Sequence, residues 1–93
     1  MFKELDPILH NQLRLRIMSV LISVESAEFK YLLEQTSSTR GNLSVQLSKL
    51  KEVDYINVKK SFRNNYPLTT CRITKRGINA FEMYVDAIST YLK

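Results

Sequence analysis

The segment from residue 39 to residue 53 carries a series of small, hydrogen-bonding and basic side chains. They are Arg40, Asn42, Ser44, Gln46, Ser48, Lys49 and Lys51. Only Val45 interrupts the series, and Glu52 is the one acidic residue of the segment. An ordinary surface helix mixes Glu with Lys four residues apart, because such pairs stabilise it. This composition therefore predicts a surface that contacts an anionic partner rich in hydrogen-bonding edges.

The other positions of this segment predict the helix that presents the surface. Leu43, Leu47, Leu50 and Val53 recur at the spacing of one face of an α-helix, and Thr39 is a suitable N-cap. A shorter helix over residues 27–35, with Ser26 as its cap, comes before it, and the polar residues 36–39 separate the two. Two helices joined by so short a turn form a helix-turn-helix.

The positive charge of the chain is concentrated in its middle part. The net charge is +5, and residues 39–76 hold nine Lys or Arg against two Asp or Glu. Residues 1–38 and residues 77–93 each carry a net charge of −1. A localised excess of this kind predicts a binding surface for a polyanion. A solvated charged face without a partner is the alternative.

A two-residue periodicity after residue 53 predicts a β-hairpin. Lys60 is the one charged residue in the inward-facing phase of the first strand, whose apolar members are Ile56, Val58 and Phe62. A second alternating run covers residues 69–74 and contains Cys71 in the inward phase. Residues 63–67, Arg-Asn-Asn-Tyr-Pro, have the composition of a turn. The hairpin therefore has a basic flank and a basic tip.

The first and last helices carry more apolar surface than one small core needs. Asn11 is the expected cap of a helix over residues 12–24, and Thr74 that of a helix over residues 75–92. The last helix has apolar residues at spacings of three and four, a heptad seam. We expect residues 5–24 and 75–92 to be dimerisation elements, with packing of the seam on its own domain as the alternative. The predicted interface residues are Leu9, Met18, Ile78, Phe81, Tyr84, Val85, Ile88, Tyr91 and Leu92.

Length and composition exclude several classes of protein. A chain of 93 residues forms one domain, expected over residues 1–93. One cysteine, Cys71, and one histidine, His10, supply neither a metal-ligand spacing nor a catalytic constellation, so we expect no enzyme and no cofactor. No run of 18 apolar residues and no signal-peptide pattern is present, which predicts a cytoplasmic protein without a membrane partner. Cys71 is expected to be a small buried hydrophobe, with a redox-sensing thiol as the alternative.

The order helix, helix, helix, strand, turn, strand, helix is that of a winged helix-turn-helix, a mainly α member of the α+β class. Particular residues carry a family resemblance as well. They are Leu5-Asp-Pro-Ile-Leu-His10 with Arg14, Ile17 and Met18, then Gly41-Asn-Leu-Ser44, Leu47, Leu50, Tyr55-Ile56, Ile73-Thr74 and Gly77. With these residues the chain resembles the small winged-helix regulators related to the MarR and ArsR groups.

The resemblance implies a homodimeric transcriptional regulator of double-stranded DNA. It implies that the third helix, residues 39–53, enters the major groove and that the wing, residues 59–68, lies against the backbone or the minor groove. Side chains that can read base edges or bind phosphates are expected on both elements. On the third helix and its turn they are Ser38, Thr39, Arg40, Asn42, Ser44, Val45, Gln46 and Lys49. On the wing they are Lys59, Lys60, Arg63, Asn64, Asn65 and Arg72.

Two further expectations concern partners. The first and last helices could frame an apolar pocket for a small-molecule effector, whose identity the sequence does not name. A winged-helix module that binds another protein and does not read DNA is the alternative function, and the charge of residues 39–76 counts against it.

Overall fold

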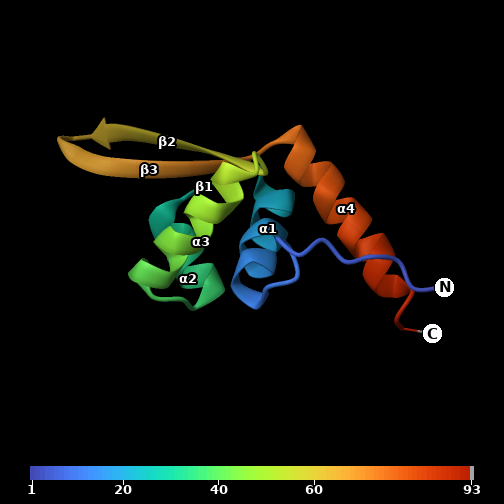
Figure 1. Cartoon of the computed structure of the whole chain (residues 1–93). Coiled ribbons are helices and arrows are strands. Elements are labelled where there is room, and N and C mark those ends of the chain that lie inside the picture. Colours follow the sequence, from blue (N-terminus) through green and yellow to red (C-terminus); the bar gives the residue numbers. More distant parts are fainter. Residues whose placement is uncertain (93) are drawn as a thin grey trace.

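The computed structural model describes residues 1–92, so Lys93 of the predicted domain lies outside the described residues. Residues 1–92 form four helices and a three-stranded antiparallel sheet (Figure 1). In chain order the elements are α1 (Gln12–Val24), β1 (Ser26–Glu28), α2 (Phe29–Thr36), α3 (Arg40–Glu52), β2 (Ile56–Arg63), β3 (Tyr66–Ile73) and α4 (Lys75–Ser89). This is the predicted winged helix-turn-helix.

Three of the four helices begin at the predicted N-caps. The side chains of Asn11, Thr39 and Thr74 accept hydrogen bonds from the backbone N–H groups of Arg14, Asn42 and Gly77, respectively. Each bond satisfies one of the N–H groups that the first turn of a helix leaves without a partner. Short-range sequence chemistry therefore determines where α1, α3 and α4 start.

The start of α2 differs from the prediction. Ser26 does not cap a helix but lies in β1, which pairs with β3 in the register Ser26–Arg72, Ala27–Cys71 and Glu28–Thr70. The helix begins only at Phe29, and its N-cap Glu28 makes no side-chain capping bond. Pairing with β3 buries Ala27 against the sheet, and this tertiary contact overrides the local preference of Ser26.

The strands β2 and β3 form a long hairpin that extends beyond the helices. Their register runs from Ile56–Ile73 to Arg63–Tyr66, and Asn64 and Asn65 close the turn with positive φ angles of 50° and 67°. Two consecutive residues of positive φ are what a tight two-residue hairpin turn requires, and Asn tolerates them. The alternating pattern of the strand places Phe62 on its inward-facing side. Because the outer part of the hairpin extends beyond the helices, Phe62 is instead 77% exposed.

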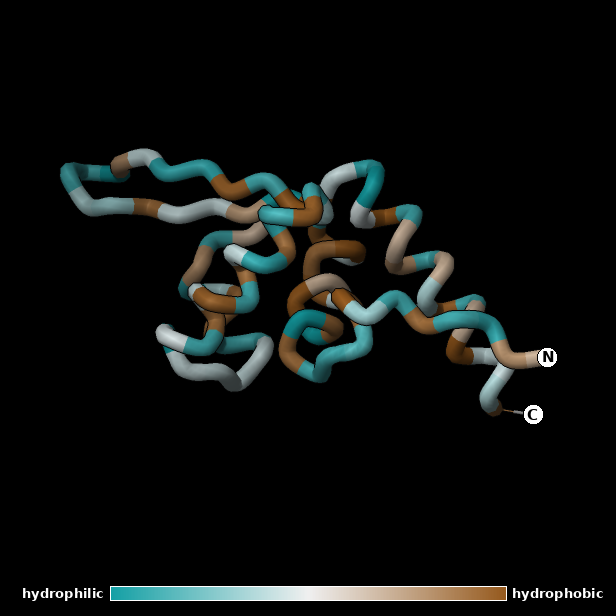
Figure 2. The backbone as a smooth tube through the Cα atoms, viewed as in Figure 1, coloured by the Kyte–Doolittle hydropathy of each residue, from teal (hydrophilic) through white to brown (hydrophobic). Residues whose placement is uncertain are grey.

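The hydrophobic core lies between the three N-terminal helices and the base of the sheet. Side chains without solvent exposure come from the turn before α1, from α1, α2 and α3, and from β3; they are Leu9, Ile17, Met18, Leu21, Leu32, Leu43, Leu50 and Cys71. Figure 2 shows that hydrophobic positions gather in the helical body and that the projecting hairpin is mostly hydrophilic. The core thus holds α3 by its apolar face only.

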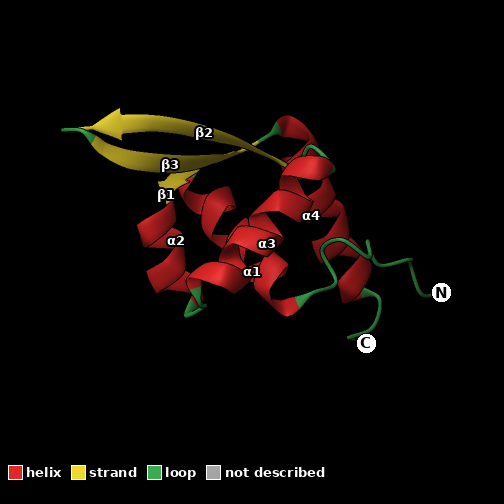
Figure 3. Cartoon of the chain, turned by 60° about the vertical axis from the view of Figure 1, so that its left-hand side comes forward, coloured by secondary structure: helices red, strands yellow, loops and turns green. Residues whose placement is uncertain are grey.

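Helix α4 lies at the end of the molecule away from the hairpin tip (Figure 1), and the N-terminal residues run close to its C-terminal half (Figure 1 and Figure 3). The phenol of Tyr91 donates to the carbonyl of Lys3 at 3.1 Å, and its ring stacks on Phe2. The ammonium of Lys3 pairs with Asp86. With the hairpin at one end and α4 at the other, the molecule measures 53 × 24 × 21 Å. Over the described residues no helix is long and apolar enough to cross a membrane.

Candidate nucleic-acid interface

Helix α3 buries one face and presents the opposite face to solvent. Leu43, Leu47 and Leu50 are buried, and the side chains around the outer half of the helix are exposed. The exposed members are Arg40, Gly41, Asn42, Ser44, Val45, Ser48, Lys49, Lys51 and Glu52. Val45 is 52% exposed at the centre of this face. Among the predicted contact residues on α3, Gln46 alone is half-buried, and the others are exposed.

Gln46 lies on the flank of α3 that faces the N-terminal turn. Its side-chain carbonyl accepts a hydrogen bond of 2.5 Å from the guanidinium of Arg14, and the same guanidinium donates to the backbone carbonyl of Ile8. One of the two lone pairs of the Gln46 amide oxygen is therefore used within the protein. The other lone pair and the N–H₂ donors remain for a ligand, and the Arg14 bond fixes the orientation in which Gln46 can meet adenine.

Hydroxyl groups at the end of α2 and in the turn that follows it form hydrogen bonds with each other and with the backbone. The hydroxyl of Ser38 lies 2.8 Å from that of Thr36, which is buried and donates to the carbonyl of Leu32. The guanidinium of Arg16 donates to the carbonyl of Thr36. Ser38 is thus half-buried, whereas Thr39 is exposed and caps α3. The guanidinium of Arg40 lies 5.8 Å from the centre of the Phe29 ring, within cation–π range.

A shallow groove separates α3 from the hairpin. Its polar lining comes from Ser44, Ser48 and Lys51 of α3 and from Lys60 and Thr69 of the hairpin, and its floor from Phe29, Leu47 and Val58. Lys60 and Thr69 are cross-strand partners, so both extend from the face of the hairpin that is turned towards α3. This explains the charged residue in the inward-facing phase of β2. Ser48, Lys51 and Thr69 were not among the predicted contacts, although the position of Lys60 could have indicated them.

The opposite face of the hairpin holds the remaining predicted cations. The guanidinium of Arg63 pairs with Glu28 at 3.0 Å, and that of Arg72 lies 3.7 Å from Glu25. All four side chains are largely exposed, so water and salt screen these pairs. Lys59 shares this face and is exposed, and within residues 1–92 it has no acidic partner. Asn64 and Asn65 are exposed at the tip.

Comparison with known proteins identifies this arrangement. Residues 13–92 match the model of the family described as the winged helix DNA-binding domain. The chain belongs to this family. It is 36% identical over 81 residues to the uncharacterised protein MJ0432 of Methanocaldococcus jannaschii, a match that covers 87% of this chain and 88% of the relative.

Solved structures agree with this membership of the winged helix DNA-binding family. A transcriptional regulator homologue from Pyrococcus horikoshii OT3 superposes with a TM-score of 0.85 at 25% identity, over 91% of this chain and 84% of the other. NadR, solved in complex with 4-hydroxyphenylacetate, superposes with a TM-score of 0.75 at 19% identity. That match covers 92% of this chain and 63% of NadR, and it shows the shared fold.

The predicted dimer residues of this winged-helix chain divide into two groups. Leu9 and Met18 have no exposed surface, and Tyr84 is 6% exposed. The hydroxyl of Tyr84 lies 3.0 Å from Nδ1 of the His10 ring. These three side chains are packed within the single chain. The other group lies on α4 and the residues after it: Val85 and Leu92 are 49% and 78% exposed, Tyr91 is exposed, and Ile78, Phe81 and Ile88 are half-buried.

The contact of α4 with its own chain uses part of the predicted seam, because Ile78, Phe81 and Ile88 pack against the core. Gly77, Tyr84 and Ala87 are its buried residues. A Cβ atom on Gly77 would lie 2.2 Å from the carbonyl oxygen of Tyr55, so only glycine permits this close approach. The close approach at Gly77 therefore brings α4 against the body, and of the seam only Val85 and Leu92 are left exposed.

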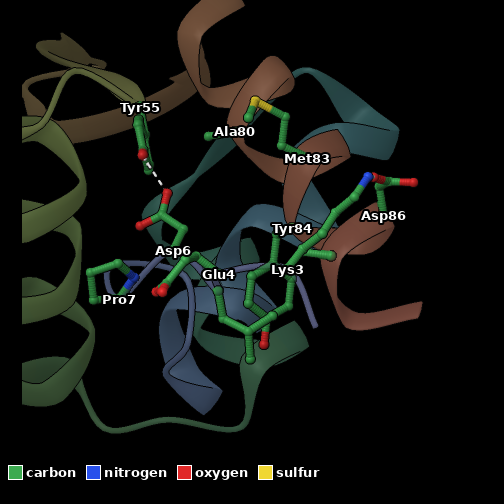
Figure 4. Close-up of a pocket in the computed structure, with 11 residues that line it drawn as sticks. Lys3, Glu4, Asp6, Pro7, Tyr55, Ala80, Met83, Tyr84 and Asp86 are labelled. Atoms are coloured by element: carbon green, nitrogen blue, oxygen red, sulfur yellow. Dashed lines mark hydrogen bonds and ion pairs between the residues drawn. The ribbon is translucent and has the colours of Figure 1, made fainter. Parts of the chain in front are cut away.

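A pocket of about 540 Å³ lies between α4 and the N-terminal residues (Figure 4). Asp6 and Tyr55 point towards each other across it, and the Tyr55 phenol donates to the Asp6 carboxylate at 2.5 Å. Burial, and then this bond to Asp6, raise the pKa of Tyr55 to about 12. Met83 and Tyr84 line the α4 side, and Lys3 and Glu4 lie at its margin. The pocket therefore touches both the N-terminal turn and the segment that follows α3.

Cys71 is buried in β3 between Ala27 and Val58 of the neighbouring strands. Burial raises the pKa of its thiol to about 11. The thiolate is the reactive form of cysteine, and this environment disfavours it. The placement agrees with the prediction of a small buried hydrophobe.

Proposed function

We propose that this winged-helix protein is a homodimeric transcriptional regulator that binds double-stranded DNA sequence-specifically. In this proposal α3 enters the major groove, and the wing, residues 59–68, lies on the adjacent backbone or minor groove. The P. horikoshii structure, described as a transcriptional regulator homologue, supports the regulatory role. An α-helix of this kind fits the width of the major groove.

The observation that carries the proposal is the charge of the surface formed by α3 and the hairpin. Arg40, Lys49, Lys51, Lys59 and Lys60 are exposed, and within residues 1–92 none of them forms an ion pair. Residues 55–81 contain no Asp or Glu at all. Cations that are unpaired within the protein, four of them on α3 or on the hairpin face turned towards it and Lys59 on the other face of the hairpin, are suited to phosphate oxygens.

Base contacts are assigned to the outer face of α3. Asn42 and Ser44 can donate to and accept from base edges, and Val45 can pack on a thymine methyl group. Lys49 and Arg40 can reach phosphates or guanine. Gln46 can contribute its N–H₂ donors and the second lone pair of its carbonyl oxygen, in the orientation that Arg14 sets. Ser38 and Thr39 contribute hydroxyl groups and the helix N-terminus to phosphate binding.

The dimer contact is assigned to the exposed seam of α4. Ile78, Phe81, Val85, Ile88 and Leu92 repeat at the spacing with which two helices pack. A second copy that covers them would remove the exposed surface of Val85 and Leu92, and the remaining exposed surface of the three half-buried residues, from water. Two recognition helices related by a two-fold axis would then meet two half-sites of a palindromic operator.

The pocket between α4 and the N-terminal residues is assigned to a small-molecule effector. Its volume of about 540 Å³ suits a small ligand. The fold neighbour NadR was solved with 4-hydroxyphenylacetate, which is a precedent for a ligand in a protein of this fold.

Selection of bound sequences from a random DNA pool, followed by salt titration, tests the proposal. A palindromic consensus is expected, and the slope of log K against log salt should be roughly −5 to −7 if the dimer neutralises about six to eight phosphates. A slope near zero, or no enriched sequence, would contradict it. Specific binding of a protein partner through α3 without DNA binding would favour the interaction module instead.

A further inference from the structure

The wing carries an exposed apolar pair on the face turned towards α3. Phe62 is 77% exposed, and its cross-strand partner is Pro67, which is also exposed. Phe62 lies two residues beyond Lys60, and Pro67 two residues before Thr69. Side chains two apart on a strand share a face, so Phe62 and Pro67 extend the groove lined by Lys60 and Thr69 towards the tip. We call Phe62 and Pro67 the wing-tip pair.

The charge around the wing-tip pair identifies the kind of partner that can cover it. Lys60 flanks it on the same face, and no acid occurs between residues 55 and 81. Arg63 follows Phe62 along the strand but lies on the opposite face, where it pairs with Glu28 across a solvent-exposed contact. A positively charged surface of this kind repels a basic partner and attracts a polyanion. The pair also continues the same surface that α3 and Lys60 form, and this surface is the proposed DNA interface.

We propose that the wing-tip pair is an apolar wedge that enters the minor groove and partly unstacks one base step. The inference rests on the proposed function, since it requires α3 to occupy the neighbouring major groove. Phe and Pro are among the side chains that proteins insert between base steps, and such insertion bends the duplex by about 20–90°. Lys60 and Arg63 then contact the phosphates on either side of the wedge. Flexible pyrimidine–purine steps are the preferred site, because they cost least to unstack.

Tyr66 provides a matched control on the same wing. It is 75% exposed and lies next to Pro67, but its cross-strand partner is Arg63, so it extends from the opposite face of the hairpin. Phe62 and Tyr66 thus have nearly the same exposure and distance from the tip and differ in the face they occupy. A general effect of losing an aromatic ring from the wing would appear in both variants.

The experiment uses the full chain, the DNA consensus selected with it, and the variants Phe62→Ala, Phe62→Leu and Tyr66→Ala. DNA bending is measured by energy transfer between dyes at the two ends of the duplex, and unstacking by the fluorescence of 2-aminopurine placed at successive positions. The natural chain is expected to bend the duplex and to brighten 2-aminopurine at one step beside each half-site. Phe62→Ala should abolish both signals and weaken binding on the order of tenfold, the loss expected for one stacked aromatic ring.

The salt dependence separates the wedge from the charges around it. Phe62→Ala should leave the slope of log K against log salt unchanged, because it removes no positive charge. Phe62→Leu should keep part of the bend, and Tyr66→Ala should behave as the natural chain. Circular dichroism of each variant checks that the hairpin and helices persist, and the exposure of both side chains makes this the expected result.

Other outcomes overturn the inference. If the natural chain binds its consensus without bending it, or if Phe62→Ala bends DNA normally, the wedge is wrong while the proposed function stands. Equal losses in Phe62→Ala and Tyr66→Ala would also overturn it, as would a change of oligomeric state in Phe62→Ala with unchanged bending. Failure of the natural chain to bind any DNA in a salt-dependent way would overturn the proposed function and the wedge together.

Discussion

Arg14 joins three parts of the molecule that are far apart in the sequence. From α1 its guanidinium donates to the carbonyl of Ile8 in the N-terminal turn and to the side chain of Gln46 on α3. Both bonds are partly buried, and each fixes the flank of α3 relative to the N-terminal turn. The sequence indicated Gln46 as a base-reading residue, but it could not reveal a hydrogen bond between residues 32 positions apart.

Replacement of Arg14 by Met should lower the free energy of unfolding by about 1–3 kcal/mol. The variant loses two charge-assisted hydrogen bonds and leaves the half-buried Gln46 oxygen without its donor. Urea denaturation at pH 7 measures the change. The control is Gln12→Met, an exposed position on the first turn of the same helix, which should change stability by less than about 0.5 kcal/mol. Equal effects of the two substitutions would show that the Arg14 bonds contribute nothing.

The Cys71 thiol makes stability depend on pH in alkaline solution. Its pKa is raised from 9.0 to about 11 by burial, so the unfolded chain releases the proton at a lower pH than the native chain does. The stability should therefore be fully present below pH 9 and fall between pH 9 and 11, by at most about 1.4 kcal/mol per pH unit from this group.

Chemical denaturation of the natural chain and of Cys71→Ala between pH 8 and pH 11 measures this dependence. The variant is less stable overall, because it leaves a small cavity, but its stability should fall less steeply between pH 9 and 11. Tyr55, whose pKa is also raised, contributes the same slope to both proteins near pH 10–12 and cancels in the comparison. Parallel curves for the two proteins would contradict the burial of the thiol.

At the scale of elements, the sequence predicted most helices and strands but not all of their contacts. Asn11, Thr39 and Thr74 cap α1, α3 and α4 as expected, because capping depends on residues within one turn. The strand β1 was missed, since three residues such as Ser26–Glu28 become a strand only by pairing with β3. The exposure of Phe62 was missed for a related reason, because strand periodicity gives the face of a residue but not where the body of the protein ends.

The groove between α3 and the wing leads to a prediction about phosphate binding. Lys60→Gln should reduce the slope of log K against log salt by about 1 for each protomer, since it removes one cation that is unpaired within the described chain. Titration of DNA binding between low and moderate salt measures the slope. Lys3→Gln is the control, because Lys3 pairs with Asp86 of α4, and α4 lies at the end of the molecule away from the hairpin tip (Figure 1). A reduced slope in the control, or none in Lys60→Gln, would contradict the assignment of the interface.

At the scale of the whole molecule, the two ends of the chain have different surfaces. The hairpin end is basic and mostly hydrophilic apart from exposed aromatic side chains near its tip (Figure 2), whereas the α4 end exposes Met83, Val85 and Leu92. The two extend in opposite directions over a length of 53 Å. A partner that covers α4 therefore leaves α3 and the wing free, so that DNA binding and self-association do not compete for the same surface.

This separation gives the prediction for Val85→Asp. Val85 is 49% exposed in the seam, and a two-fold axis would place both copies of the substituted carboxylate within one apolar interface. Unpaired charges cost free energy when they are removed from water, so the dimer dissociation constant should rise by at least about tenfold. Sedimentation equilibrium over a range of protein concentrations measures it.

Met83→Asp is the matched control for this substitution. Met83 is 72% exposed on the same helix, but it lines the pocket beside the N-terminal segment and not the seam (Figure 4). It should leave the dimer intact, whereas Val85→Asp should yield a folded monomer that binds a single half-site and no longer binds a palindrome tightly. Dissociation by both variants would mean that the partner covers the pocket side of α4. A dimer that survives Val85→Asp would mean that the seam is not the interface, and the spacing of α3 on two half-sites would then have to be set by another surface.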